Sequence, residues 1–258
     1  MVGTFPFSPI EDLADQLATF FESWTQCAKS SEDNISNSQG LDAKYLDNFF
    51  NTLAPAIGEF HSSGAFVNVW EISGVGFDEL RNSKILSWFL DRNAEHGLAT
   101  KILTALVNYL HDRSGKNVLI FPNLTDVIDA EYSTIVESCP FGEKESRIDI
   151  EIDGEKFLLF VEVKINAAET GNQLDRYVTL ASKKSNGRLW GVIFLTPTGR
   201  APSDSQGKDR PALLCKHLLC MSWAEVSAVF LTVASAIQPG LVRAMLTQYA
   251  KFIKTFRG

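Results

Sequence analysis

The sequence has 258 residues, of which 45% are hydrophobic and 21% are charged, a balance typical of one large globular domain or two small ones. It excludes a disordered chain and a collagen, and the four scattered cysteines exclude a disulfide scaffold. The formal net charge of −7 excludes a protein that coats nucleic acid with a uniformly basic surface.

The N-terminus is not expected to be a targeting signal of the secretory type. Residues 1–15 lack a basic stretch followed by an apolar one. No run in the sequence reaches the roughly 18 apolar residues of a membrane helix. We therefore expect no membrane contact and a location in the reducing cytoplasm.

The first part of the chain is predicted to be helical. Apolar residues recur with helical spacing over 9–29 and again over 41–60, on either side of a polar Ser/Asn-rich break. Residues 1–80 contain 2 basic and 12 acidic side chains, which makes them a poor surface for phosphates. We expect residues 1–70 to form an N-terminal helical extension that caps the protein or docks a partner.

Residues 71–258 are expected to form one domain with two C-terminal helices. Asp78 is predicted to cap a helix that begins near Phe77, with Glu79 in its first turn. Helices and strands then alternate in an order that predicts an α/β fold, a mixed central β-sheet flanked by helices. The further predicted helices are 98–113, 170–185, 222–237 and 239–256, and the predicted strands are 118–121, 127–135, 147–153, 157–165, 189–196 and 218–221.

The two strands within 147–165 carry alternating acidic and apolar residues. A four-residue loop over 154–157 would pair Asp149 with Glu162, whereas a tight turn at Asp153 and Gly154 would pair Asp149 with Leu158. We favour the longer loop. Glu151 shares the face of Asp149 and is expected to be a solvated strand residue.

Opposed carboxylates on a buried hairpin destabilise it unless a cation lies between them. Oxygen ligands of this kind suit Mg²⁺ or Mn²⁺ rather than zinc. Lys164, on the same face as Glu162, is placed to orient or polarise an attacking water. The alternative is that Glu162 and Lys164 form a charge pair on a solvated edge strand.

These residues resemble the signature of a known family. Asp149, twelve intervening residues and then Glu162-Val163-Lys164 resemble the D-(x)n-E-x-K motif of the PD-(D/E)XK nuclease superfamily, although Ile148 stands where the name motif has proline. The helix with Gln173, Arg176 and Tyr177 resembles the Q-x-x-x-Y helix of several members. The segment that begins at Glu79 resembles the first-helix motif of one uncharacterised bacterial branch. The resemblance covers about residues 77–196.

The resemblance implies a restriction-endonuclease-like αβββαβ core and a role for each matching residue. Lys164 would orient the nucleophilic water or stabilise developing charge, and Glu79 would bind the metal through water or hold Lys164. The residues that it implies as catalytic are Asp149, Glu162, Lys164, Glu79 and Gln173. The implied metal ligands are Asp149, Glu162, Glu79 and the backbone carbonyl of Val163, and the implied substrate-positioning residues are Gln173, Tyr177 and Arg176.

The activity implied by the resemblance is metal-dependent hydrolysis of phosphodiester bonds in DNA, by an endo- or exonuclease of bacterial or phage defence or of DNA repair, with Mg²⁺ or Mn²⁺ as cofactor. The charge distribution is compatible with it, since residues 166–258 contain 12 basic and only 5 acidic side chains. Two alternatives remain: a non-catalytic module that binds nucleic acid or protein, and a subunit that is active only in an assembly. The expected protein partner is a second copy or a protein docked on the acidic helices.

Overall fold

The structure, a computed structural model, describes residues 43–62, 67–114, 131–140, 142, 147–166, 173–200 and 216–256. The chain divides into two compact units, Met1–Asn68 and Val69–Gly258. The described part of the first unit is helix α2 (Ala43–Ser62), which overlaps the helix predicted over 41–60, together with residues 67–68. The helix predicted over 9–29 and the strand predicted over 118–121 lie outside the described residues. The predicted division into 1–70 and 71–258 stays a prediction.

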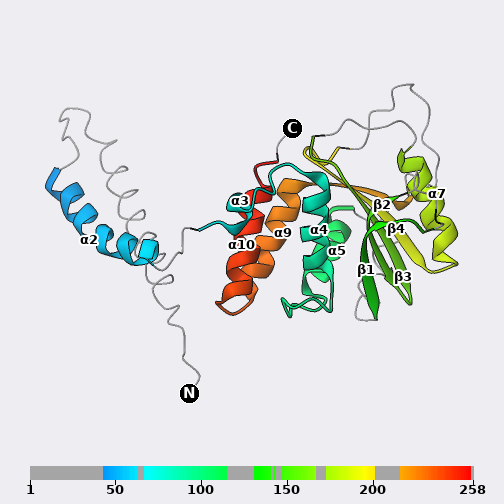
Figure 1. Ribbon diagram of the computed structural model, residues 1–258, viewed down its shortest axis with the longest axis horizontal. Coiled ribbons are helices and arrows are strands. Elements are labelled where there is room, and N and C mark those ends of the chain that lie inside the picture. The colour runs from blue at the N-terminus through cyan, green and yellow to red at the C-terminus, as the bar shows by residue number, and fades with distance from the viewer. Residues whose placement is uncertain are drawn as a thin grey trace, which may run out of the picture. The chain divides into compact units, whose positions relative to one another are not determined.

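The second unit is built on a five-stranded sheet in the order β1-β2-β3-β4-β5. The first three strands pair antiparallel, whereas β3, β4 and β5 pair parallel, so the sheet is mixed, as predicted (Figure 1). The strands are β1 (Tyr132–Ser138), β2 (Ile148–Gly154), β3 (Phe157–Val163), β4 (Leu189–Thr196) and β5 (Leu218–Ser222).

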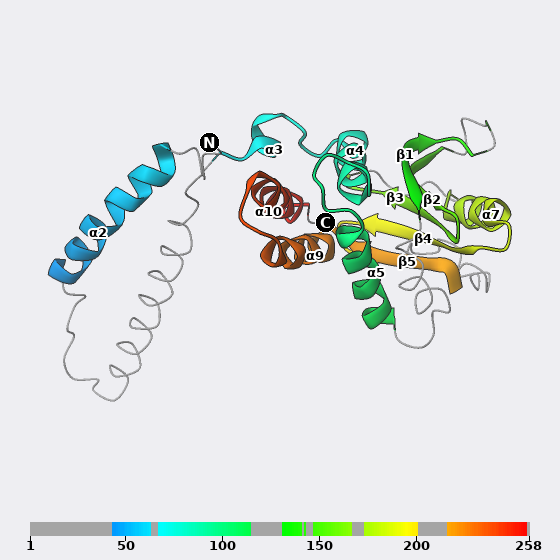
Figure 2. The same cartoon turned by 90° about the horizontal axis from the view of Figure 1, so that it is seen from below.

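Helices cover both faces of this sheet. Helix α7 packs on one face, and the bundle of α4, α5, α9 and α10 lies on the other (Figure 2). The short helix α3 was not predicted from the sequence. The helices of this unit are α3 (Val69–Ile72), α4 (Glu79–Leu90), α5 (Lys101–Ser114), α7 (Gln173–Ser185), α9 (Trp223–Ala236) and α10 (Leu241–Ile253).

Strand β3 is buried along its whole length because helices cover the sheet on both sides. Successive side chains of a strand point to opposite faces. Leu159 and Val161 therefore pack in the core formed with α4, α5, α9 and α10, whereas Leu158 and Phe160 pack in the smaller core under α7. Glu162 lies two residues after Phe160, so its side chain points to the α7 side of the sheet.

The register of β2 against β3 agrees with the longer of the two predicted loops. Asp153 pairs with Leu158, and Ile150 pairs with Val161. One further step along the same antiparallel register brings Asp149 opposite Glu162. Directly opposed residues lie on the same face of a sheet, with Cβ atoms about 5 Å apart.

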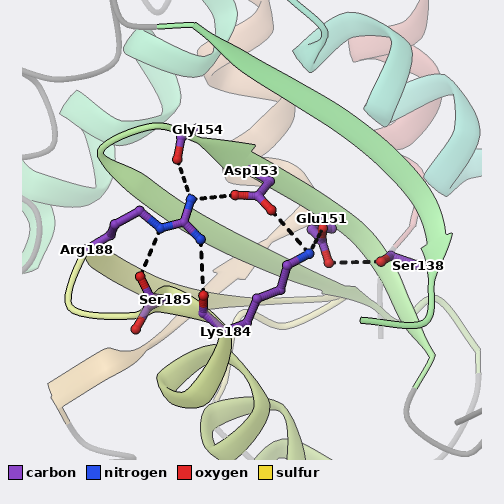
Figure 3. Close-up of polar contacts among 7 residues, drawn as sticks. All are labelled: Ser138, Glu151, Asp153, Gly154, Lys184, Ser185 and Arg188. Carbon is purple, nitrogen blue, oxygen red and sulfur yellow. Dashed lines mark hydrogen bonds and ion pairs between the residues drawn. The ribbon is translucent and has the colours of Figure 1, made fainter. Parts of the chain in front are cut away.

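A second acidic residue of β2, Glu151, is also buried, so the expectation that it is solvated is wrong. Its side chain is 0% exposed, accepts a hydrogen bond from Ser138 Oγ at 2.9 Å and pairs with Lys184 Nζ. Lys184 Nζ also lies 3.2 Å from Asp153, which pairs with Arg188 at 2.6 Å. Figure 3 shows this network between the hairpin and the C-terminal end of α7. Helix α7 covers the face and supplies Lys184, the cation that makes burial of Glu151 tolerable.

Candidate active site

Residues that are distant in sequence meet where β3 ends. Asp149 is the second residue of β2, Glu162 is the penultimate residue of β3, and Lys164 follows that strand directly. Glu79 is the first residue of α4, whose N-cap is Asp78 as predicted, since its side chain accepts from the Arg81 N–H. The site lies at the carboxyl ends of the parallel strands β3 and β4, the edge at which open α/β sheets bind ligands.

Two carboxyl groups form the centre of the site. Asp149 Oδ2 accepts a hydrogen bond from the backbone N–H of Val163 at 2.9 Å, and the Asp149 and Glu162 carboxyl groups interact with each other. The Glu162 side chain is only 1% exposed. Burial raises the pKa of Asp149. Burial, together with the neighbouring Asp149, raises the pKa of Glu162 to about 7.

Lys164 provides a positive charge beside this pair. Its Nζ lies 2.8 Å from Glu162 Oε1, and its side chain is 14% exposed. Burial alone would lower the pKa of Lys164, but the nearby carboxylates Glu162, Glu79 and Asp149 raise it above the ordinary lysine value. The side chain is therefore an ammonium group at neutral pH. Because Glu162 is buried, the alternative of a charge pair on a solvated edge does not describe this strand.

The backbone around Lys164 is fixed from three directions. Its N–H donates to the Leu195 carbonyl of β4 at 2.8 Å, and its carbonyl accepts from Trp223 Nε1 at 2.9 Å. Glu79 Oε1 accepts from the next N–H, that of Ile165, at 2.7 Å. Three separate elements thus hold the lysine in place.

The contact from Trp223 was missed by the sequence reasoning. Trp223 is fully buried and is the first residue of α9, whose N-cap Ser222 forms a capping box with Glu225. The Ser-x-x-Glu spacing is a sequence signal for a helix start. It identifies where α9 begins, but the indole contact with Lys164 depends on how α9 packs beside β3.

The residues of α7 are divided between the interior and the surface. Tyr177 is buried, and its hydroxyl donates to the Arg147 carbonyl at 2.6 Å and also interacts with Glu162. Arg176 is exposed. Gln173 is the first residue of the helix, and its side chain lies outside the described residues. The structure thus brings Tyr177 to the carboxylate pair and leaves Arg176 in solvent.

The donor set at the site fits a hard divalent cation. Among the residues that the structure describes, no group of three or more His, Cys, Asp or Glu side chains is arranged to hold a metal ion. Mg²⁺, however, commonly binds through one or two carboxylates and keeps several waters. Two adjacent carboxyl groups whose pKa values are both raised are groups that a cation would stabilise in the ionised form. Asp149 and Glu162 therefore fit the ion without a third acidic ligand.

The raised pKa of Glu162 makes the stability of the metal-free protein depend on pH. An unfolded glutamate ionises near 4.5 and the folded one near 7, so between these values the folded state binds more protons and stability falls as pH rises. We expect ionisation of Glu162 to lower the free energy of unfolding by about 3 kcal/mol as the pH rises across this window. Urea unfolding with chelator at several pH values should show this loss in the wild type and not in Glu162→Gln. The control Glu155→Gln, at an exposed position, should lose as much stability as the wild type. An equal loss in Glu162→Gln would contradict the assignment of this pH dependence to Glu162.

A comparison with known families agrees with this geometry. The model of the PD-(D/E)XK nuclease superfamily matches residues 67–257, and the chain belongs to this superfamily. No curated protein and no solved structure gave a significant match. No helix within the described ranges is both long and apolar enough to span a bilayer.

Proposed function

We propose that this chain hydrolyses phosphodiester bonds of nucleic acid, with DNA as the substrate and Mg²⁺ or Mn²⁺ as the cofactor. One observation carries the proposal: Asp149 and Glu162 form a buried carboxyl pair, and Lys164 Nζ lies 2.8 Å from Glu162. Membership of a nuclease superfamily supports it. The predicted cytoplasmic location and the roles in defence or repair stay predictions.

The proposed roles follow from charge and position. Asp149 and Glu162 would hold the metal, with the Val163 carbonyl as the third protein ligand. When bound, such an ion polarises the scissile phosphate and lowers the pKa of a coordinated water. Because Lys164 stays protonated, it would orient the attacking water or stabilise the charge that develops on the phosphate, and it would not act as a base.

Two further residues are proposed to position the catalytic ones. Glu79 anchors the backbone after Lys164 through the Ile165 N–H, which supports the predicted role of holding the lysine. Tyr177 holds the start of β2 through the Arg147 carbonyl and thus orients Asp149. The predicted contacts of Gln173, Tyr177 and Arg176 with the scissile phosphate stay proposals.

A panel of substrates tests the proposal. Purified protein is incubated with supercoiled plasmid, linear duplex, single-stranded DNA and RNA, each with Mg²⁺ and with chelator. We expect DNA to be cleaved only with the metal. Cleavage of RNA alone would show that the substrate is RNA and not DNA. No cleavage of any substrate with Mg²⁺ or Mn²⁺ would favour the non-catalytic module or the subunit that needs an assembly partner.

A further inference from the structure

An exposed aromatic side chain lies in the segment that leads into α4. Phe77 is 52% exposed, and Leu80, one helical turn further along, is 40% exposed. Phe77 directly precedes the N-cap of α4, and Glu79, the first residue of that helix, bonds the backbone after Lys164. The exposed ring therefore belongs to the segment that also anchors the catalytic lysine.

A chain of ring contacts leads from Phe77 to Lys164. The Phe77 ring lies 5.2 Å from that of Phe256, which lies 5.1 Å from Trp223. Trp223 Nε1 in turn donates to the Lys164 carbonyl at 2.9 Å. Figure 1 shows the starts of α4 and α9 and the C-terminal end of α10 at the same end of the unit. Phe256 and Trp223 are buried, so the exposed Phe77 ring packs against the edge of the core.

Helix capping does not account for the exposed ring. A hydrophobic residue before the N-cap often packs on the fourth residue of the helix, but that position in α4 is Asn82, which is polar. The Asn82 amide instead donates to the Gly76 and Asp78 carbonyls. Phe77 thus keeps about half of its surface in water without forming a hydrophobic staple.

An exposed cationic side chain lies in the same segment as Phe256. Lys254 is exposed and precedes by two residues the Phe256 ring on which Phe77 rests. A lysine close to an exposed aromatic ring is the combination that proteins use for single-stranded nucleic acid, since the ring stacks on a base and the cation contacts the backbone. Lys254 would then contact a backbone phosphate, while the neighbouring unpaired base stacks on the Phe77 ring.

We propose that Phe77 is a stacking platform for an unpaired base of the bound strand, so that the preferred substrate is single-stranded DNA or DNA with an unpaired end. This inference rests on the proposed function. A base within a closed duplex is stacked on both faces and cannot cover the ring. Stacking therefore distinguishes the two forms of DNA, whereas backbone contacts do not.

Binding measurements on the full chain test this inference. The Lys164→Met background prevents cleavage, and fluorescence anisotropy with Mg²⁺ follows a labelled single strand and the matching closed duplex. We expect Phe77→Ala to weaken binding of the single strand about 10-fold and that of the duplex much less. Phe77→Tyr should bind like the background protein, and Phe77→Leu, which keeps an apolar contact with Phe256, should be weakened like Phe77→Ala.

The control is Leu241→Ala, which removes a 73% exposed apolar side chain at the opposite end of α10 and should leave binding unchanged. Unchanged binding of the single strand by Phe77→Ala, or an equal loss on both DNA forms, would overturn the stacking role. The proposed function would survive that result if the wild type still cleaved DNA with Mg²⁺. If the background protein bound neither DNA form and the wild type cleaved no DNA with Mg²⁺, both proposals would fail.

Discussion

Lys164→Met should reduce metal-dependent cleavage by about a thousandfold, the size of effect seen when one group that stabilises transition-state charge is removed. The ammonium group lies 2.8 Å from Glu162, and methionine keeps the length of the side chain but has no charge. Initial cleavage rates at saturating Mg²⁺ measure the effect. Melting temperatures of the two proteins show whether the fold is retained.

The matched control for this prediction is Lys156→Met. Lys156 is an exposed residue of the turn between β2 and β3, at the opposite end of the hairpin from the carboxyl pair. The Lys156→Met protein should cleave DNA at the wild-type rate. A Lys164→Met protein that is folded and retains more than about a tenth of the wild-type rate would mean that the lysine does not serve the chemical step.

Lys184→Met should lower the free energy of unfolding by about 3 kcal/mol, because it leaves the carboxylate of Glu151 buried without its cation. Glu151 is fully buried, and its remaining hydrogen bond from Ser138 does not replace a positive charge. Urea denaturation measures the loss. The same substitution at the adjacent, exposed Lys183 should change stability by less than about 0.5 kcal/mol.

The double variant Glu151→Leu/Lys184→Met separates the two causes of such a loss. Since apolar replacement of both partners of a buried pair is often neutral or stabilising, it should be more stable than Lys184→Met alone. If the single and double variants were equally unstable, the loss would come from packing of the lysine stem and not from the unpaired charge.

The hairpin that carries Asp149 and Glu162 could be predicted because its pattern is local. Alternation of acidic and apolar residues defines the two faces, and the loop length defines the register that the structure has. The start of α4 could be predicted for the same reason, since Asp78 caps the N–H three residues ahead. Such features depend on spacing alone.

The features that could not be predicted depend on how helices dock on the sheet. Alternation places Glu151 on the face of Asp149, but its burial follows from α7, which brings Lys184 over that face. The contact between Trp223 and the Lys164 carbonyl likewise needs α9 beside the end of β3. The roles assigned to Glu79, Gln173 and Arg176 stay predictions.

The most direct test of the central claim is the initial rate of DNA cleavage as a function of Mg²⁺ concentration, measured for the wild type beside Lys164→Met. The carboxyl pair and its ammonium neighbour predict a rate that rises with Mg²⁺ to a plateau in the wild type, is abolished by chelator and is nearly absent in the variant. A rate that is independent of Mg²⁺, or equal in the two proteins, would contradict the claim that this site hydrolyses phosphodiester bonds.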